Sequence, residues 1–422
     1  MSTSTTASST STSSSESTGA SILIADTFQG EGVDALRSLG CTVHVEPDLG
    51  TADLPARLAD CDPDILLVRS TKVDRASIES CSNLSLILRA GAGYDTIDLE
   101  AASAHGISVA NCPGMNAIAV AELAWSLILA CDRRIPDQTR DLRAGTWDKK
   151  GYGKSRGLHG RTLGIIGLGR IGRAVAERGR SFGMKVVGWS RSLTPEDAEL
   201  MGITPCADPL EVAREADVVS LHVAANTQTA GMIDARFLAE MRDGATLINT
   251  TRGSLIDEAA LLDAVDSKGL RVGLDVYASE PGSGDTSFSN ELLERPGVYG
   301  THHVGASTDQ AQAAIAAEAV RVIIHYMDSG DVLHCVNLAS NTPASFKLTV
   351  RHLNRPGVLA SIFELVGQAG INVEEMENII FEGGHAACAR IQLGGELVED
   401  QLEAIRGNAN VISASLTPLT TD

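Results

Sequence analysis

Three short segments in the second half of the chain carry side chains that could act together on a small carboxylic acid. Arg252 lies in the run NTTRG, Glu280 in DVYASEP and His303 in THHVG. Hydride transfer at a 2-hydroxy acid needs a base for the hydroxyl proton, a group that orients this base, and a cation for the carboxylate. A guanidinium suits the last role because it can clamp a carboxylate with two parallel hydrogen bonds. The sequence therefore predicts His303, Glu280 and Arg252 as catalytic residues, in that order of roles.

A glycine-rich run upstream of these segments points to a nucleotide cofactor. Residues 167–172 read GLGRIG, directly after the apolar run TLGII and directly before a helix-like run. In this setting the first glycine permits a tight turn and the second lets backbone N–H groups approach a pyrophosphate, while the third lets the helix pack closely on the strand. We predict a dinucleotide site that includes Gly167, Gly169 and Gly172.

The residues that would read the adenosine ribose are not acidic. The next predicted strand ends in Gly-Trp-Ser-Arg, so Ser190 and Arg191 occupy the position where an Asp or Glu favours NAD. These two side chains could hold a 2′-phosphate, which would favour NADP. Alternatively, Arg191 stacks on the adenine or faces solvent. We expect NAD as the cofactor and leave NADP open.

The pattern of apolar residues predicts the scaffold that brings these segments together. Short apolar runs alternate with longer amphipathic runs in a βαβα order, which is typical of parallel sheets covered by helices on both faces. The order runs twice along the chain, so we predict two doubly wound (Rossmann-like) α/β units. The predicted strands are 21–26, 41–46, 64–69 and 84–89 in the first unit, and 162–167, 185–189, 218–222, 246–249 and 272–275 in the second.

A third, smaller unit follows the two α/β units. Its order is strand, helix, strand, strand, helix, strand, which is the ferredoxin-like βαββαβ pattern. Long apolar helices are expected at 116–133 and 308–327. The predicted domains are a disordered Ser/Thr-rich tail (1–20), a substrate-binding domain (21–115 and 303–330), a dinucleotide-binding domain (116–302), a linker (331–344) and a regulatory βαββαβ domain (345–420).

Composition excludes several classes of partner. The 422 residues include 34 basic and 54 acidic side chains, which gives a formal net charge of −20. This balance argues against nucleic-acid and anionic-membrane partners, since both bind clustered Lys and Arg. No apolar run reaches the ~20 residues that cross a bilayer. The eight cysteines form no Cys-x-x-Cys pair and have no ligand spacing with histidine, so we expect no metal site and a reducing, cytoplasmic location.

Taken together, the motifs resemble those of the D-isomer-specific 2-hydroxyacid dehydrogenases, over about residues 21–420. The matching stretches include LRAGAGYDTIDLEAA, LGIIGLGRIGRAVAERGRSFGMKVVG, NTTRGSLIDEAAL, GLDVYASEP and HHVGAST. The resemblance implies two Rossmann-like domains and the catalytic roles given above. It also implies that Arg170 and Ile171 contact the cofactor phosphates and that Asp275 contacts the nicotinamide amide. Thr250 and Thr251 would lie beside the cofactor.

The resemblance further implies a substrate, 3-phospho-D-glycerate, which would be oxidised to 3-phosphooxypyruvate in the first step of L-serine biosynthesis. Two alternatives stay open. The substrate could be another 2-oxo acid, such as hydroxypyruvate or glyoxylate, or the chain could be a non-catalytic dinucleotide-sensing regulator. The implied substrate contacts are Arg69, Ser70, Gly91, Ala92 and Gly93. Arg89 and Lys149 offer further cations for a phosphate, and Lys149 could come from a neighbouring subunit. Alternatively, Lys149 belongs to a solvated surface run.

The third unit resembles the ACT regulatory domain, through the runs HLNRPGVL and GINV. The resemblance implies an amino-acid effector, expected to be L-serine, held by His352, Asn354 and Asn372. An Asn amide can bond both the carboxylate and the ammonium of an amino acid. Alternatively, the two Asn side chains only cap turns. Paired effector domains would make the protein a homo-oligomer, a dimer or a tetramer.

Overall fold

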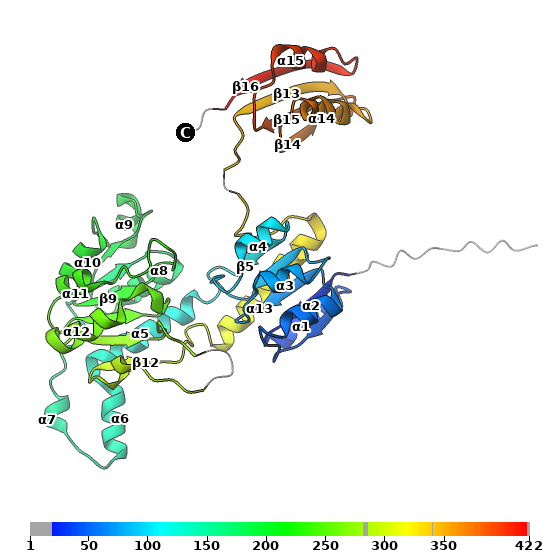
Figure 1. Cartoon of the computed structure of the whole chain (residues 1–422). Coiled ribbons are helices and arrows are strands. Elements are labelled where there is room, and N and C mark those ends of the chain that lie inside the picture. The colour runs from blue at the N-terminus through cyan, green and yellow to red at the C-terminus, as the bar shows by residue number, and fades with distance from the viewer. Residues whose placement is uncertain (1–18, 282–285, 340, 420–422) are drawn as a thin grey trace, which may run out of the picture. The chain divides into compact units, whose positions relative to one another are not determined.

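The computed structural model describes residues 19–281, 286–339 and 341–419 (Figure 1). The chain divides into two compact units, Met1–Asn337 and Leu338–Asp422. The larger unit consists of two lobes, each built on its own parallel sheet. Most of the predicted Ser/Thr-rich tail lies outside the described residues, so that expectation stays a prediction.

The first lobe is a five-stranded parallel sheet with helices on both faces. Its elements are β1 (Ser21–Ile24), β2 (Thr42–Val45), β3 (Ile65–Val68), β4 (Leu86–Arg89), β5 (Ser108–Asn111), α1 (Gly30–Ser38), α2 (Leu54–Cys61), α3 (Arg75–Glu79), α4 (Leu99–Ala104) and α13 (Asp309–Ser329). The strand order is β2-β1-β3-β4-β5. Helices α1 and α13 cover one face and α2, α3 and α4 the other, so Ile, Leu and Val side chains fill both faces of the central strands.

The second lobe is a larger sheet of the same kind, with seven parallel strands. Its elements are β6 (Thr162–Ile166), β7 (Lys185–Trp189), β8 (Thr204–Pro205), β9 (Val218–Leu221), β10 (Thr246–Asn249), β11 (Arg271–Leu274), β12 (Val298–Gly300), α5 (Ala117–Arg133), α8 (Arg170–Ser181), α9 (Pro195–Met201), α10 (Pro209–Glu215), α11 (Ala235–Glu240) and α12 (Glu258–Lys268). Helices α5 and α8 cover one face, and α10, α11 and α12 cover the other.

The strand order of this lobe creates a place for a ligand. In the order β12-β11-β10-β9-β6-β7-β8, the chain runs outward from β6 to β8 and then returns to place β9 on the other side of β6. Where the direction reverses, the loops that leave the carboxyl ends of the two neighbouring strands separate, and open parallel sheets bind ligands in that crevice. The glycine run 167–172 directly follows β6, so the fold places it at this crevice.

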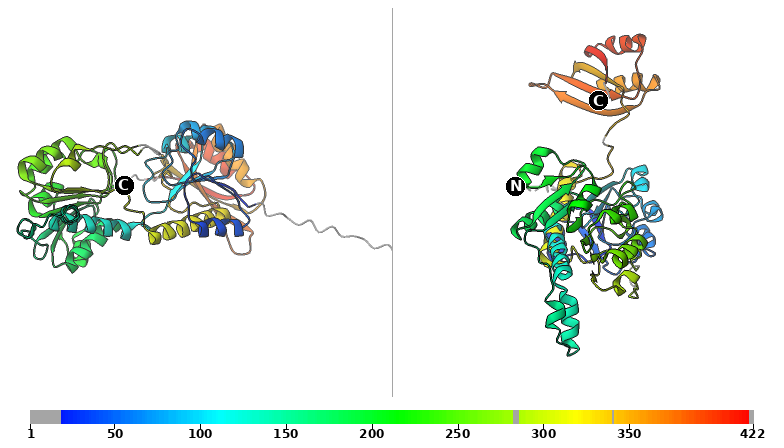
Figure 2. Two further views of the ribbon diagram at one scale, coloured as in Figure 1. Left: turned by 90° about the horizontal axis from the view of Figure 1, so that it is seen from below. Right: turned by 90° about the vertical axis from the view of Figure 1, so that its left-hand side faces the viewer.

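The chain crosses between the two lobes twice. It leaves the first lobe after β5 and enters α5, and it returns after β12 to enter α13. The two helices contact each other where the lobes join, as the view from below shows (Figure 2). His303 lies on the returning crossing, so the fold places it at the boundary between the lobes.

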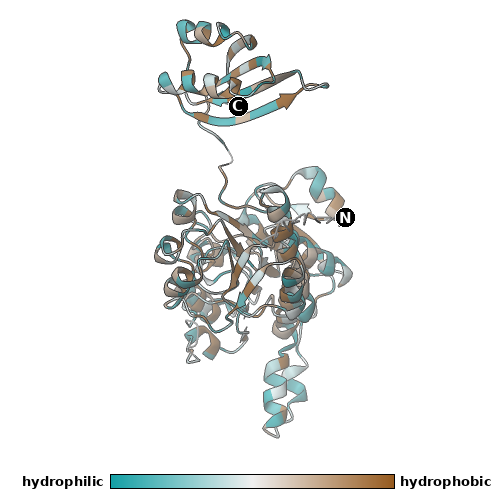
Figure 3. Ribbon diagram, turned by 90° about the vertical axis from the view of Figure 1, so that its right-hand side faces the viewer, coloured by the Kyte–Doolittle hydropathy of each residue, from teal (hydrophilic) through white to brown (hydrophobic). Residues whose placement is uncertain are grey.

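Two short helices form an arm that projects from the second lobe (Figure 1). They are α6 (Ile135–Arg143) and α7 (Lys149–Tyr152), and neither buries a residue. The hydroxyl of Tyr299 in β12 donates to Asp137 Oδ2 at 2.8 Å and so ties the arm to its sheet. Hydrophilic residues predominate in the arm, in contrast to the apolar strands of the sheets (Figure 3).

The smaller unit is a four-stranded antiparallel sheet, in the order β14-β15-β13-β16, with two helices packed on it. Its elements are β13 (Phe346–Leu353), α14 (Val358–Gln368), β14 (Val373–Ile380), β15 (Ala386–Leu393), α15 (Glu399–Arg406) and β16 (Val411–Pro418). Leu348, Val350 and Ile391 of the sheet are fully buried with Ile362 of α14. The predicted βαββαβ order is therefore confirmed.

The predicted fold class is confirmed, and the differences concern short or polar segments. The pattern missed β5, β8 and β12, which have two to four residues and too few apolar positions to stand out. The predicted linker at 331–344 starts on the first lobe, where Val336 N–H donates to Val109 O and Val109 N–H to Asn337 Oδ1, each at 2.8 Å. Of the helices that the structure describes, none has the length and hydropathy needed to cross a bilayer.

Candidate active site

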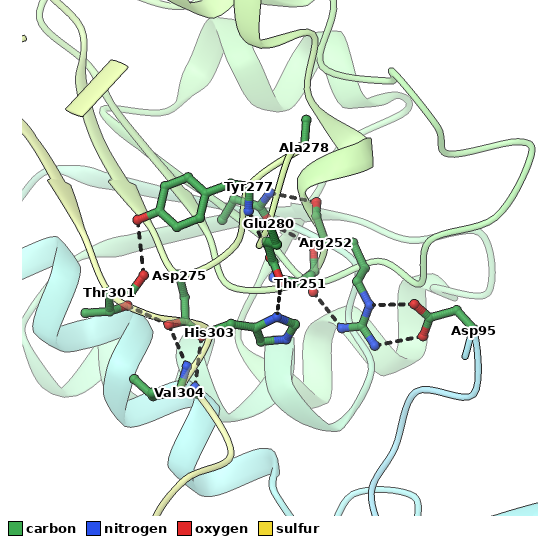
Figure 4. Close-up of polar contacts among 12 residues, drawn as sticks. Asp95, Thr251, Arg252, Asp275, Tyr277, Ala278, Glu280, Thr301, His303 and Val304 are labelled. Atoms are coloured by element: carbon green, nitrogen blue, oxygen red, sulfur yellow. Dashed lines mark hydrogen bonds and ion pairs between the residues drawn. The ribbon is translucent and has the colours of Figure 1, made fainter. Parts of the chain in front are cut away.

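The predicted acid–base pair is assembled in the structure. His303 Nδ1 lies 2.7 Å from Glu280 Oε2, and the backbone N–H of Tyr277 donates to Oε1 of the same carboxylate at 3.0 Å (Figure 4). Burial raises the pKa of Glu280, but the hydrogen bonds from His303 and Tyr277 outweigh this effect, and the pKa lies below its ordinary value. The ionised carboxylate favours a proton on Nδ1, which leaves Nε2 of the imidazole as the proton acceptor.

The loop that carries His303 is held in a backbone conformation that non-glycine residues rarely adopt, with φ of 53°. The N–H of His303 donates to the Asp275 carbonyl oxygen at 2.8 Å. The Asp275 carboxylate accepts hydrogen bonds from the Thr301 hydroxyl at 2.6 Å and from the N–H groups of Val304 and Gly305 at 2.9 Å each. The end of β11 thus fixes the loop on both sides of the histidine, as strained conformations require.

The contacts of Asp275 differ from those that the family resemblance predicts. The family resemblance places its carboxylate at the nicotinamide amide, whereas the structure places it, 1% exposed, beneath the His303 loop. Its hydrogen bonds to this loop use three of about four acceptor positions of a carboxylate. One position remains, so a cofactor contact stays a prediction. The anchoring of the loop was not apparent from the sequence, because the hydrogen-bond donors lie 26 to 30 residues away.

Arg252 pairs with a carboxylate from the opposite lobe. Its Nη2 and Nε donate to Asp95 Oδ1 and Oδ2 at 2.9 and 3.2 Å, and its Nη1 donates to the Thr251 carbonyl oxygen at 2.7 Å. The hydrogen bond from Arg252 lowers the pKa of Asp95. The charge of Arg252 also contributes to the lowered pKa of Glu280, and Figure 4 shows the guanidinium and the imidazole in one region. The predicted trio therefore shares a single site.

The glycines of the first-lobe run RAGAG let two arginine side chains approach the backbone closely. Gly91 has φ of 152°, and a Cβ atom there would overlap Arg89 Nη1, while a Cβ atom at Gly93 would overlap Arg252 Nη2. The N–H groups of Ala92 and Gly93 have no hydrogen-bond partner among the described residues. Two adjacent backbone donors beside a guanidinium suit a carboxylate.

Three guanidinium groups gather around this site. Burial lowers the pKa of Arg89 to about 10, the charges of Arg252 and Arg69 add to this effect, and the charge of Asp95 opposes it. The group therefore keeps its proton at neutral pH. Arg89 Nε donates to the Arg69 carbonyl oxygen at 3.0 Å, and Arg69 Nη2 lies 3.4 Å from the Ser307 hydroxyl.

A buried carboxylate holds the loop that carries Arg69. Asp26, 7% exposed, accepts hydrogen bonds from the N–H groups of Arg69 at 2.7 Å and of Ser70 and Thr71 at 3.1 Å each. Its Oδ1 accepts the Ser70 hydroxyl at 2.7 Å. Ser70, which the resemblance predicts as a substrate contact, thus directs both of its donors to Asp26 and supports the position of Arg69.

A cleft of about 1030 Å³ opens at the reversal of strand order, and its lining includes Gly167, Gly169, Arg170, Ser190 and Arg191. The backbone geometry of the glycine run is compatible with the predicted roles, and the cofactor contacts stay predictions. Gly167 has φ of 97°, and a Cβ atom at Gly172 would overlap the carbonyl oxygen of Gly167. At Gly169 a Cβ atom would meet nothing within 4 Å, so the space over its backbone is open to a ligand.

Two buried polar atoms at neighbouring strand ends have no hydrogen-bond partner among the described residues. They are Nδ1 of His222, which follows β9, and Oγ1 of Thr250, which follows β10. Burial lowers the pKa of His222 to about 3, so its imidazole is neutral, and Nε2 lies 2.8 Å from the Ser220 hydroxyl. Because buried polar groups rarely stay unpaired, these atoms and the open cleft fit a bound dinucleotide. The sequence reasoning did not single out His222 as a site residue.

The remaining predicted cofactor residues lie nearby with other contacts. Ile171 packs against the core between α5, α8 and the sheet. The Thr251 hydroxyl donates to Asn249 Oδ1 at 2.7 Å. Arg191 Nη1 donates to Gln228 Oε1 at 3.1 Å, on the wall of the cleft.

Two further groups of predicted residues lie in other parts of the chain. Lys149 is the exposed first residue of α7, on the projecting arm. In the smaller unit, His352 is 2% exposed and its Nε2 lies 3.2 Å from Asn378 Oδ1. Asn354 donates to the Gly384 carbonyl oxygen at 3.0 Å and Asn372 to Glu374 Oε1 at 2.9 Å, and both Asn residues are exposed.

Comparison with known proteins identifies the family. The family model described as D-isomer specific 2-hydroxyacid dehydrogenase, NAD binding domain, matches residues 125–305. A D-3-phosphoglycerate dehydrogenase of Methanocaldococcus jannaschii is 36% identical over 392 residues, which cover 91% of this chain and 69% of that protein. This chain belongs to the D-isomer specific 2-hydroxyacid dehydrogenase family. The chain is therefore an NAD(P)-dependent dehydrogenase, and the catalytic roles of Arg252, Glu280 and His303 stay predictions.

Two further relatives of this dehydrogenase show the range of the family. A hydroxypyruvate reductase of Thermotoga maritima is 42% identical over 262 residues, which cover 62% of this chain and 83% of that protein. The NAD⁺-bound 3-phosphoglycerate dehydrogenase of Entamoeba histolytica has a similar structure, with a TM-score of 0.62 and 28% identity over 76% of this chain and 99% of that one. The dehydrogenase spans only 64% and 60% of the length of two other D-3-phosphoglycerate dehydrogenases.

Proposed function

We propose that this dehydrogenase oxidises 3-phospho-D-glycerate to 3-phosphooxypyruvate, the first step of L-serine biosynthesis. The observation that carries the proposal is the set of guanidinium groups of Arg69, Arg89 and Arg252 around one site, with Asp95 as the carboxylate that opposes them. A partly buried cation without a partner is costly. A substrate with a carboxylate and a phosphate would supply the missing negative charge.

In this proposal each group has one role in the reaction. Arg252 and the N–H groups of Ala92 and Gly93 bind the substrate carboxylate. Nε2 of His303 accepts the proton of the 2-hydroxyl group, while Glu280 keeps Nδ1 protonated and stabilises the imidazolium that forms. The cleft lined by Gly167, Gly169 and Arg170 would hold the nicotinamide cofactor, which would supply the hydride acceptor for C2. Arg69 and Arg89 are left to bind the phosphate.

The test compares substrates in the reductive direction, where initial rates are read from consumption of the reduced cofactor. We expect kcat/KM for 3-phosphooxypyruvate to exceed that for hydroxypyruvate and glyoxylate. In the Arg69→Ala variant this preference should largely disappear, because the variant loses a phosphate ligand but no catalytic group. Equal losses for phosphorylated and unphosphorylated substrates would contradict the proposed role of the arginines.

A second candidate function is the reduction of hydroxypyruvate. It is favoured by the hydroxypyruvate reductase of Thermotoga maritima. Over its aligned region, this relative is more similar in sequence (42%) than the Methanocaldococcus jannaschii relative (36%), and the alignment covers 83% of its length. The same assay separates the two functions, since a hydroxypyruvate reductase would prefer the unphosphorylated acid and would be insensitive to Arg69→Ala. If no 2-oxo acid were reduced at all, the third alternative, a dinucleotide-sensing regulator, would be favoured.

We further propose that the smaller unit is an ACT domain that binds L-serine as a feedback inhibitor. Its βαββαβ fold supports this assignment. Asn354 and Asn372 are exposed and so accessible to an amino acid. His352 is buried and hydrogen-bonded, so it would act by supporting the site unless binding rearranges it.

We also propose that the protein is a homo-oligomer that associates through the arm of α6 and α7. The arm exposes the apolar side chains of Ile135, Leu142 and Trp147, at 50%, 57% and 79%. A second copy that covers them could carry Lys149 toward a neighbouring substrate site. The oligomer mass of wild-type protein and of the Leu142→Asp variant, measured by light scattering, tests this proposal.

We also propose a reducing, cytoplasmic location, which the eight free cysteines support.

A further inference from the structure

We propose that Asp95 is a positioning residue, which holds Arg252 in the orientation that receives the substrate carboxylate. The two residues lie in different lobes and 157 positions apart in the chain, yet they form a two-bond pair at 2.9 and 3.2 Å (Figure 4). Such pairs fix the plane of the guanidinium as well as its position. The pair is therefore suited to orienting the one cation that acts directly on the reacting end of the substrate.

The number of donors allows substrate and Asp95 to bind Arg252 at the same time. A guanidinium has five N–H bonds. Asp95 takes one from Nε and one from Nη2, and the Thr251 carbonyl oxygen takes one from Nη1. One N–H bond remains on each terminal nitrogen and can donate to the substrate carboxylate. Asp95 therefore has no need to leave when the substrate binds.

The backbone around Asp95 is anchored well enough to serve as a reference point. On one side, Gly93 lies so close to Arg252 that a Cβ atom would overlap Nη2. On the other side, Ile97 pairs with Val73 in a parallel bridge, and the Val73 N–H donates to the Thr96 carbonyl oxygen at 2.9 Å. The turn that carries Asp95 is thus fixed to the first lobe at one end and packed against Arg252 at the other.

The crossing between lobes gives the pair a consequence for substrate binding. Asp95 belongs to the first lobe, as do Arg69 and Arg89, whereas Arg252 belongs to the second. The Asp95–Arg252 pair spans the two lobes in the relative position described here. Arg252 is therefore oriented in the arrangement that also brings the first-lobe cations to the site. This inference applies to any 2-oxo acid and does not depend on the substrate being phosphorylated.

The test uses Asp95→Ala, Asp95→Asn and Asp95→Glu, assayed with the best of the three 2-oxo acids named above. We expect Asp95→Ala to lower kcat/KM for the 2-oxo acid by roughly fivefold, mainly through a higher KM, as for the loss of one partly exposed ion pair. The KM for the reduced cofactor should change less than twofold. Asp95→Asn should resemble Asp95→Ala, and Asp95→Glu, which keeps the charge, should recover most of the loss.

The chain offers a closely matched control. Asp266 pairs with Arg295 in the second lobe with nearly the same exposure, 54% and 27%, as the 57% and 30% of Asp95 and Arg252. Asp266→Asn should leave both KM values unchanged and should match Asp95→Asn in melting temperature. An unchanged or lower KM for the 2-oxo acid in Asp95→Ala would overturn the proposal, because a lower KM means that Asp95 competes with the substrate for Arg252.

Discussion

His303 Nδ1 and Glu280 Oε2 lie 2.7 Å apart, although 23 residues separate them in the chain. Glu280 follows β11 and His303 follows β12. Because these parallel strands end at the same edge of the second sheet, the carboxylate reaches the imidazole. Glu280 is ionised, since its hydrogen bonds hold its pKa below the ordinary value. This contact makes the histidine a directed base, and it leads to the first prediction.

Glu280→Gln should lower kcat by about 10²-fold and His303→Ala by about 10²–10⁴-fold, because proton transfer by a positioned base contributes on this order. The glutamine keeps the size of the side chain but removes the charge that stabilises the imidazolium. Steady-state rates with saturating reduced cofactor measure the effect, and cofactor KM serves as the control. A loss below tenfold in His303→Ala would mean that another group accepts the proton.

Arg191→Ala should change cofactor preference without changing the chemistry. Arg191 lines the cofactor cleft beside Ser190 and is held by Gln228 at 3.1 Å. If it contacts a 2′-phosphate, the variant raises KM for NADPH by about tenfold, as for the loss of one charge-assisted hydrogen bond, and leaves that for NADH unchanged. The measurement is initial rates with both cofactors at fixed 2-oxo acid. Equal changes for the two cofactors would show that Arg191 stacks on the adenine or only faces solvent.

Glu318→Gln should weaken the attachment of residues 331–337 to the first lobe. Glu318 accepts hydrogen bonds from Arg321, at 2.6 and 2.9 Å, and lies 2.6 Å from His334 Nε2. The hydrogen bond from Arg321, with one from His334, lowers the pKa of Glu318 to about 2 against the opposing effect of burial. We expect the free energy of unfolding at pH 7 to fall by about 2 kcal/mol.

The pH dependence of this effect has a definite sign. A carboxylate with a lowered pKa stabilises the folded state above its ordinary pKa of 4.5, and this stabilisation is lost as the pH falls toward 2. The difference between wild type and Glu318→Gln should therefore be largest at neutral pH and shrink below pH 4.5. Denaturant titrations at several pH values measure it, with Glu403→Gln, an exposed partner of Arg406, as the control. A difference that grows in acid would contradict the assignment.

Asn372→Ala should abolish inhibition by L-serine and leave the uninhibited rate unchanged. Asn372 is exposed in the smaller unit, and its side-chain amide donates to the nearby Glu374 Oε1 at 2.9 Å. Its amide is therefore available to an amino acid at low cost. Rates at increasing L-serine concentration, for wild type and variant, measure the effect. Inhibition that persists unchanged in the variant would place the effector elsewhere.

The elements of the fold could be predicted closely because their signals are local. Burial of a strand on both faces requires a continuous run of Ile, Leu and Val, as in β3 with its four fully buried residues. The glycine run 167–172 could be assigned roles glycine by glycine, since each depends on the backbone of one turn. Arg252 and Glu280 were accessible for a similar reason, since each lies in a segment that follows a predicted strand, and parallel strands end at one edge. His303 was predicted from its run THHVG, although the pattern missed β12, the strand that precedes it.

The partners of these residues could not be predicted. Asp26 lies 43 residues from the loop that it holds, and Asp95 lies 157 residues from Arg252. In the sequence, no pattern of charge or spacing distinguishes Asp26 or Asp95 from the other acidic residues. Asp275 was predicted as a site residue, but its hydrogen bonds to the His303 loop were not.

The sequence by itself thus determined most of the strands and helices, their order, and which segments carry an imidazole, a carboxylate and a guanidinium. Only the tertiary structure decided which acidic side chain meets each of those groups and which buried atoms remain unpaired. The physical reason is one of range: apolar periodicity and turn chemistry depend on neighbours in the chain. Hydrogen bonds between lobes depend on how two separately folded sheets close on each other.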